Sequence, residues 1–447
     1  MMTKGILKTG QLAKEVASPR AMLVAASYEG GLHGWAVRDT ESGVALKLGF
    51  SFGAHIGCVR AIATTPPTSA RQLLVSGGDD EIIRIYDLHS SAAVGELQRH
   101  VATVTSLEFC GGAGAHLLSA SADGVICVWR TRDWTCLHML GGHKGEVNCV
   151  RAHPSARIAI SVGCDRTMRL WNLMEGRIAF IKRLKRGAAH TLAWSAPSGE
   201  RYALVCGTHV LVYRTGDASA DGDPLAVEIS HPRRVHAIQF LASSCERLIA
   251  TAGDEGVVRV FDVAPADSSG QPELLRELRL GDAPKPGAAP SAPTASLRVK
   301  GLSVVPVMGA RPSARNETMG SAARALAQWG DENWLCVATS TGTVTVWNVG
   351  RGTTSEAESS DREGSASERA IATGSTISST RFTCLVSAVV TADATSGPLG
   401  DGKRMGRPEP AAGAAPTVDL EGERPKKARK GEDKPPGRRK PRVRFAS

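Results

Sequence analysis

The 447-residue chain is poor in aromatic residues and has no long hydrophobic run. Aromatic side chains make up 4% of it, and no stretch comes near the roughly 18 to 20 consecutive apolar residues that a membrane-spanning helix requires. We therefore expect no membrane partner. The ten cysteines include no C-x-x-C pair, which argues against a zinc ribbon or a thioredoxin-like redox site. Most of them lie in apolar runs, where a free thiol behaves as a small hydrophobic side chain, and this favours a reducing compartment.

Short motifs of catalysis are also missing. The chain has no G-x-x-x-x-G-K-[ST] phosphate loop, no G-x-S-x-G nucleophile elbow and no H-E-x-x-H metal site. Residues 141–146 (GGHKGE) are rich in glycine and include a lysine, but they lack the Ser or Thr of a phosphate loop, so we expect no nucleotide site there. The chain is accordingly predicted to be no enzyme, with no catalytic residue, metal ligand or cofactor.

What the chain does have is glycine, proline and an uneven positive charge. With 48 Gly and 23 Pro, it suits many short elements better than a few long helices. The net charge is +10, and residues 403–447 contain 14 Lys or Arg against 6 Asp or Glu. We therefore predict an N-terminal extension (1–20), a globular body (21–390) with low-complexity inserts at 264–296, 305–332 and 350–376, and a disordered basic tail (391–447).

One pattern recurs along the body: a short apolar run, small residues, an acidic or glycine turn, a second apolar run and then an aromatic residue. Its clearest copies are 73–88 (LLVSGGDDEIIRIYDL), 117–130 (LLSASADGVICVWR) and 159–173 (AISVGCDRTMRLWNL). Seven aromatic residues close the copies: Trp35, Tyr86, Trp129, Trp171, Tyr213, Phe261 and Trp347. Successive members are 42 to 51 residues apart, except for the last interval of 86 residues. A period near 42 residues is typical of the blades of a β-propeller.

A further apolar strand is expected between the copies, at 58–63, 104–109, 147–152, 189–194, 235–240, 297–304 and 382–388. The first copy begins at Leu23 with no such strand before it, and the last strand has no copy after it. The segment 377–390 can therefore supply the missing inner strand of the first blade and close the ring. Closure removes the unpaired sheet edges that an open array would present.

The copies resemble the WD40 repeat, which implies an all-β fold, a seven-bladed WD40 propeller. In that family an Asp, a His, a Ser and a Trp of one blade form a buried hydrogen-bond network. The residues at these positions are Asp80, His55, Ser76 and Tyr86; Asp123, His100, Ser119 and Trp129; and Asp165, His143, Ser161 and Trp171. Gly207 and Thr341 take the Asp position elsewhere, and Glu29 and Glu255 match it approximately, so those blades should be held mainly by packing.

Residues 21–262 also resemble the p21-activated-kinase-interacting WD-repeat proteins, which include a nucleolar assembly factor of the large ribosomal subunit. The distinctive stretch runs from Trp171-Asn172-Leu173 through Glu175-Gly176-Arg177 to Ala179-Phe180-Ile181-Lys182. The resemblance implies a scaffold in the nucleus and nucleolus, monomeric within a larger complex. Its partners would be assembly proteins, the pre-ribosomal large-subunit particle and the rRNA backbone. The rival interpretation is a signalling adaptor that binds and restrains a protein kinase.

Two groups of basic residues are candidates for contacts. The tail groups resemble nuclear localisation signals and could also neutralise phosphates, although a merely solubilising tail has the same composition; they are Lys426, Lys427, Arg429, Lys430, Arg438, Arg439 and Lys440. The blade-4 group could touch rRNA or an acidic partner, or could simply be a solvated outer strand; it consists of Arg177, Lys182, Arg183, Lys185 and Arg186. No sequence signature of an RNA-binding module accompanies them, so base-specific recognition is not expected.

Overall fold

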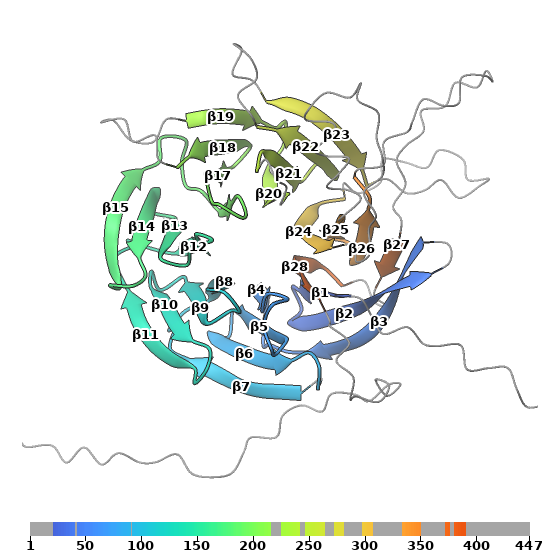
Figure 1. Ribbon diagram of the computed structural model, residues 1–447, viewed down its shortest axis with the longest axis horizontal. Coiled ribbons are helices and arrows are strands. Elements are labelled where there is room, and N and C mark those ends of the chain that lie inside the picture. The colour runs from blue at the N-terminus through green and yellow to red at the C-terminus, as the bar shows by residue number, and fades with distance from the viewer. Residues whose placement is uncertain are drawn as a thin grey trace, which may run out of the picture. The chain divides into compact units, whose positions relative to one another are not determined.

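The computed structural model is a ring of four-stranded antiparallel sheets (Figure 1). It describes residues 21–40, 43–90, 92–215, 225–241, 246–263, 272–280, 297–306, 333–349, 372–375 and 380–389. All of them belong to one compact unit, residues 1–405. Within these residues there are seven sheets, which confirms the all-β fold and the seven-bladed propeller.

The strands of each blade follow one another from the channel outward. Blade 1 comprises β28 (Phe382–Val389), β1 (Ala21–Ser27), β2 (Gly31–Thr40) and β3 (Gly43–Gly53); blade 2 comprises β4 (Val59–Thr64), β5 (Leu73–Gly78), β6 (Ile82–Asp87) and β7 (Ala92–Gln98); blade 3 comprises β8 (Val104–Cys110), β9 (His116–Ser121), β10 (Ile126–Arg130) and β11 (Thr135–Leu140); blade 4 comprises β12 (Val147–Ala152), β13 (Ile158–Gly163), β14 (Thr167–Asn172) and β15 (Arg177–Arg183). Blade 5 comprises β16 (Thr191–Trp194), β17 (Arg201–Cys206), β18 (His209–Arg214) and β19 (Leu225–Ser230); blade 6 comprises β20 (Val235–Phe240), β21 (Leu248–Gly253), β22 (Val257–Asp262) and β23 (Glu273–Arg279); blade 7 comprises β24 (Val299–Pro306), β25 (Asn333–Thr339), β26 (Thr343–Trp347) and β27 (Ala372–Ser375).

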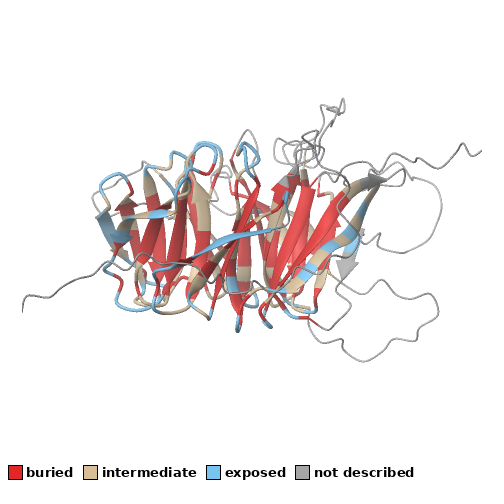
Figure 2. Ribbon diagram, turned by 90° about the horizontal axis from the view of Figure 1, so that it is seen from below, coloured by how far each residue is buried: buried red, intermediate tan, exposed pale blue. Residues whose placement is uncertain are grey.

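Burial follows the position of a strand in its blade (Figure 2). Every residue of the second strands β1, β5, β17 and β21 is buried, because these strands are covered on both faces by the neighbouring blades. The outer strands are more exposed than the second strands, and in β7 Leu97 is the one buried residue. Apolar residues that run without alternation therefore mark the inner part of a blade, and the sequence pattern found those strands for this reason.

The hydrophobic core is divided among the junctions between blades. The described residues form seven buried clusters, and each contains side chains from two adjacent blades. At the junction of blades 7 and 1, for example, Trp334 and Val346 share a cluster with Leu23 and Trp35. The ring is thus held by the same kind of contact at the closing junction as at the others.

Ring closure occurs as the sequence predicted. Strand β28 pairs antiparallel with β1, with Leu23 opposite Ser387 and Val24 opposite Val386. The Thr383 hydroxyl also donates to the carbonyl of Ala26 at 3.2 Å. The last described strand of the chain therefore completes the first blade.

All three expected inserts overlap with strands. Strand β23 (Glu273–Arg279) lies inside the expected insert 264–296, and β27 (Ala372–Ser375) lies inside the expected insert 350–376. Strand β24 continues to Pro306, past the expected start of the insert 305–332. Strand β27 is the outer strand of blade 7, and its sequence ATGS has no hydrophobic run because an outer strand pairs along one edge and faces solvent on the other side. The N-terminal extension, the basic tail and its candidate nuclear localisation residues lie outside the described residues.

Candidate functional site

Each predicted network in blades 2 to 4 is assembled in the structure. In blade 3, His100 Nδ1 lies 3.0 Å from Asp123 Oδ2, and His100 Nε2 lies 2.8 Å from Ser119 Oγ. The indole N–H of Trp129 donates to the same Ser119 oxygen at 2.9 Å. These four side chains connect the loop before the inner strand, the second strand, the following turn and the third strand of the blade.

Blade 4 repeats this geometry almost unchanged. His143 contacts Asp165 at 3.0 Å and Ser161 at 2.7 Å, and Trp171 donates to Ser161 at 2.8 Å. Burial would raise the pKa of Asp165, but hydrogen bonds from Thr167, from a backbone N–H and from His143 bring it down to about 2. Burial lowers the pKa of His143, and Asp165 opposes that shift.

Blade 2 has a tyrosine in place of the tryptophan. His55 lies 2.7 Å from both Asp80 Oδ1 and Ser76 Oγ, and Arg84 donates to Asp80 Oδ2 at 2.7 Å. Burial would raise the pKa of Asp80, but hydrogen bonds from His55 and Arg84 outweigh it and hold the pKa well below its usual range. In all three blades the His and Ser side chains are buried, so the networks hold strands together and are not placed to meet a substrate.

Blade 6 contains a partial network, in which the sequence analysis identified Glu255 and Phe261 but missed His231. His231 stands 30 residues before Phe261, close to the His-to-aromatic spacing of the other blades, and its ring meets Phe261 edge-on with centroids 5.8 Å apart. Phe261 has no N–H to donate, and among the described residues the buried His231 Nε2 has no hydrogen-bond partner. Glu255 takes the Asp position and pairs with Arg259 at 2.6 Å. The spacing could have identified His231, although the residue types of this blade differ from those of blades 2 to 4.

The candidate basic group of blade 4 is only partly available for a partner. Lys182 lies over the ring of Tyr213, 4.6 Å from its centroid, and Arg186 pairs with Glu228 at 2.9 Å. Arg177 pairs with a neighbouring glutamate of its own loop. Arg183 and Lys185 are the exposed members for which no such contact is found among the described residues.

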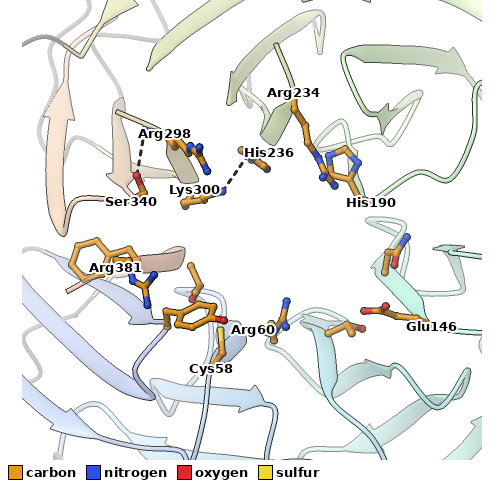
Figure 3. A pocket seen from close by; sticks show the side chains of 15 residues that line it. Cys58, Arg60, Glu146, His190, Arg234, His236, Arg298, Lys300, Ser340 and Arg381 are labelled. Carbon is orange, nitrogen blue, oxygen red and sulfur yellow. Dashed lines mark hydrogen bonds between the residues drawn. The ribbon is translucent and has the colours of Figure 1, made fainter. Parts of the chain in front are cut away.

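A second cluster of charge, not identified from the sequence, surrounds the mouth of the central channel (Figure 3). The cavity there has a volume of about 950 Å³. In six blades the second residue of the inner strand lines the mouth, and in blade 5 the residue just before β16, His190, does so. The seven blades thus form a ring of side chains: Arg60, Thr105, Asn148, His190, His236, Lys300 and Thr383. Arg234, Arg298 and Arg381 precede three of these strands and add to the positive charge of the mouth.

Acidic side chains neutralise part of this ring. Asp79 pairs with Arg60 at 3.2 Å, and Asp254 contacts His236 at 2.6 Å and Arg298 at 3.6 Å. Glu146 is the carboxylate among the residues that line the cavity, and it lies on blade 4, across the channel from Lys300.

The ammonium group of Lys300 lies among other cationic side chains at the channel mouth. It lies 3.2 Å from His236 Nε2. Burial lowers the pKa of Lys300, nearby Arg298 and Arg234 lower it further, and Asp254 opposes them. Cations are thus held close together at one side of the opening.

The described residues contain no group of three His, Cys, Asp or Glu side chains arranged to hold a metal ion. Nor do they include a helix long and apolar enough to cross a membrane.

Comparison with known proteins matches the family "WD domain, G-beta repeat" at residues 46–87, 92–130 and 134–172. The chain is a WD40-repeat propeller. The three matched repeats end at or beside Tyr86, Trp129 and Trp171, which close the three complete networks.

Among similar proteins is "p21-activated protein kinase-interacting protein 1-like" of Xenopus laevis, 40% identical over 242 residues, which are 54% of this chain and 62% of the relative. The Homo sapiens "p21-activated protein kinase-interacting protein 1" is 38% identical over 246 residues, covering 54% and 58% of the two chains. "Protein MAK11" of Saccharomyces cerevisiae is 38% identical over 185 residues, covering 38% and 44%. The WD40 propeller thus has homologues named for interaction with p21-activated protein kinase, as the sequence resemblance predicted. The matches span about three fifths or less of these relatives' length.

Proposed function

We propose that this WD40 propeller is a non-enzymatic scaffold in nucleolar assembly of the large ribosomal subunit, where it docks assembly proteins and precursor rRNA. The observation that carries the proposal is the outer face of blade 4. This face includes the distinctive stretch of the resemblance and presents Met174, Phe180 and Ile181 to solvent at 71, 45 and 50% exposure. These exposed apolar side chains lie on the same outer edge of the blade as the exposed cations Arg183 and Lys185, a combination suited to a protein partner with acidic residues.

A matched pair of variants tests this docking surface in the full chain. Phe180→Asp with Ile181→Asp alters the outer strand of blade 4, and Leu137→Asp with Met139→Asp makes the same chemical change on β11 of blade 3. These control residues are 37 and 49% exposed, so the two pairs should lose similar stability. We expect the blade-4 variant alone to leave the particle fractions when tagged protein is sedimented from cell extract. Equal sedimentation of both variants would contradict the use of this surface.

The rRNA contact is a separate part of the proposal. Treating the extract with RNase should release tagged protein from the heavy fractions if RNA contributes to docking. Changing Lys182, Arg183, Lys185 and Arg186 to Glu should make RNA binding weaker and its salt dependence shallower, because phosphate contacts release counterions. Equal binding and equal salt slopes of the two proteins would restrict RNA contact to the basic tail.

A protein kinase is the partner in the competing proposal. The vertebrate relatives are named for interaction with p21-activated protein kinase, and this name is the observation in its favour. Identifying the proteins that co-purify with the tagged chain separates the two roles, because a kinase without ribosomal or assembly proteins would favour the adaptor.

Nuclear and nucleolar residence is proposed from the basic tail. Deleting residues 422–447 from a fluorescent fusion should shift its signal to the cytoplasm. An unchanged nucleolar pattern would show that another part of the chain directs localisation.

A further inference from the structure

One position in the turn between the second and third strands has a left-handed backbone. It directly follows the residue at the Asp position of the network. In blades 1, 3, 6 and 7 it is a glycine, with φ between 70 and 83°: Gly30, Gly124, Gly256 and Gly342. Glycine is the usual residue there because it lacks the Cβ that a positive φ brings into conflict with the backbone. Blades 2 and 4 have Glu81 and Arg166 at this position instead, with φ of 66 and 58°.

The fold gains little from side chains at this position. A left-handed backbone is strained in residues other than glycine. Space is also short, since a Cβ at Gly124 would lie 3.1 Å from the carbonyl oxygen of His143. Glu81 and Arg166 are exposed, and their side chains have no hydrogen bond or ion pair among the described residues. Strain that contacts within the protein do not offset is typical of residues that contact a ligand or a partner.

Two apolar side chains lie on the same face of the propeller. Ile56 and Val101 are 79 and 77% exposed, the highest values among the described large hydrophobic residues. Each directly follows the network histidine of its blade, in the loop before the inner strand. The N–H of Ile56 donates to Asp80 at 3.3 Å, and that of Val101 donates to Asp123 at 3.2 Å. The networks therefore hold both loops in place, and the two side chains project from a fixed backbone.

One carboxylate brings these two loops together. Asp79 accepts from the backbone N–H of Cys58 at 3.2 Å and from the hydroxyl of Thr103 at 3.4 Å. Cys58 lies two residues after Ile56, and Thr103 lies two residues after Val101. The apolar side chains are thus on adjacent, bridged loops of blades 2 and 3. Exposed apolar side chains on a fixed backbone lose little conformational entropy on binding, which favours a protein partner.

The charge changes sign from blade 2 to blade 4. Lys144 takes the loop position in blade 4, where its N–H donates to Asp165 at 3.0 Å. Its side chain is exposed and has no partner among the described residues. Blades 2, 3 and 4 are neighbours in the ring (Figure 1). Acidic, apolar and basic side chains therefore follow one another along the blade 2–4 rim, which consists of Glu81, Ile56, Val101, Lys144 and Arg166.

A nucleic acid fits this rim less well than a protein does. Single-stranded RNA is held by aromatic side chains as well as by positive charge. The centre of the rim is aliphatic, and Glu81 would repel a phosphate backbone. In protein interfaces, by contrast, an apolar centre with polar and charged residues at its margin is the usual arrangement.

We propose that the blade 2–4 rim docks a segment of a partner protein that carries an apolar residue between a basic and an acidic one. The basic residue pairs with Glu81, and the acidic residue pairs with Arg166 or Lys144. The apolar residue packs against Ile56 and Val101. This inference rests on the scaffold function proposed above, for which it names a second docking surface and the chemistry of the partner.

Substitution by glycine separates a contact role from a structural role. Glu81→Gly reproduces the Asp-Gly turn of blade 3, and Arg166→Gly makes the same turn in blade 4. Both changes relieve the backbone, so the melting temperature should stay the same or rise. Ala156→Gly is the matched control, because Ala156 has a φ of 55° in the connection between β12 and β13, at the opposite end of the blade. Glu81→Gln and Arg166→Gln replace the glycine variants if these lower the melting temperature.

Site-specific photocrosslinking in cells measures docking of the full chain. The photoreactive residue p-benzoylphenylalanine replaces Ile56 or Val101. Leu274 on β23, which is 47% exposed, is the control site. We expect both rim sites to crosslink to the same protein, at a segment with a basic residue on one side and an acidic residue on the other. A segment without these charges overturns the proposal.

The variants then test the charged contacts. Glu81→Gly or Arg166→Gly should lower the crosslinked fraction about threefold or more, as expected for the loss of an exposed ion pair. Ala156→Gly should leave it within about twofold of wild type. Equal crosslinked fractions in all three variants overturn the proposal, as does rim crosslinking no stronger than that at Leu274. Crosslinks to RNA in place of protein overturn it in favour of a nucleic-acid partner.

Sedimentation with particles is measured for the same proteins and separates this inference from the proposed function. Particle association of the wild type without any rim crosslink overturns the inference and leaves the proposed function standing. A rim crosslink that follows the expected pattern in a chain that does not sediment with particles supports the docking surface and contradicts the ribosomal role.

Discussion

Replacing Ser119 by Ala should destabilise the propeller far more than its small change in volume suggests. Ser119 is completely buried, and its hydroxyl oxygen accepts from Trp129 and contacts His100. The indole N–H can only donate. In the neutral imidazole whose Nδ1–H donates to Asp123, His100 Nε2 accepts, and the Ser119 hydroxyl donates to it. The serine therefore relays a continuous chain of hydrogen bonds from the indole to the carboxylate.

Ser119→Ala leaves a buried indole N–H and a buried imidazole nitrogen without partners. Each unsatisfied group costs roughly 1 to 3 kcal/mol, so the two together should lower the free energy of unfolding by about 3 kcal/mol. Trp129→Phe removes the indole donor, and the Ser119–His100 bond survives it. Because both variants break one shared bond, the double variant should lose less than the sum of the two single losses.

Thr251→Val is the matched control, in the partial network of blade 6. The Thr251 hydroxyl reaches the carbonyl of Arg259 at 3.4 Å, a weak contact, and the neighbouring Phe261 has nothing to donate. We expect this variant to lose less than about 1 kcal/mol. Urea unfolding followed by tryptophan fluorescence and circular dichroism measures all four proteins. If Ser119→Ala and Thr251→Val were equally stable, the network would contribute nothing beyond packing.

Three other perturbations have defined outcomes. A chain ending at Asn348 lacks β27 and β28, which leaves sheet edges of blades 7 and 1 unpaired. It should aggregate, or melt at a lower temperature than a chain ending at Ala392. Equal melting temperatures of the two chains would contradict closure of the ring by β28. Burial and the neighbouring Arg259 lower the pKa of His231 to about 4, so the unfolded chain binds the proton more readily and the free energy of unfolding falls as pH drops from 6.5 to 4. In His231→Leu this loss of stability at low pH should be smaller by about 2 kcal/mol, measured by unfolding titrations at each pH. An unchanged pH profile would refute the role of His231. Burial raises the pKa of Glu108 to about 7, so the folded state binds the proton more readily and the free energy of unfolding declines as pH rises from 4.5 to 7. Glu108→Gln should remove this decline. A decline of the same size in the variant would exclude Glu108 as its cause.

The sequence predicted the features that repeat. The inner strands are apolar on nearly every residue because both of their faces are buried, and the networks recur at fixed spacing because each lies within a single blade. The outer strands β23 and β27 were missed because solvent imposes no continuous hydrophobic pattern on them. His231 was missed because blade 6 keeps the spacing of the network and changes its residue types.

The channel mouth could not be predicted in the same way. Its ring positions differ in residue type from blade to blade, with Arg60, Asn148 and Lys300 at equivalent places. No short spacing connects them, since Arg60 and Lys300 meet at one opening only when the ring is closed. Charge at such a site is a property of the assembled propeller, so the sequence analysis placed the basic surface on blade 4 and in the tail alone.

In blades 2 and 6 the turn between the second and third strands contacts both the hydrogen-bond network of the blade and the channel mouth. In blade 2, Asp80 is held in the network by His55, and the preceding Asp79 reaches Arg60 at the channel. In blade 6, Glu255 is likewise paired within the blade, and the preceding Asp254 reaches the channel. One residue of the turn therefore fixes the strands and its neighbour sets the charge of the mouth. Because the first is held by the hydrogen bonds of its own blade, the second can vary from blade to blade without weakening the ring. This separation allows the charge of the channel mouth to differ from blade to blade on an otherwise repetitive scaffold.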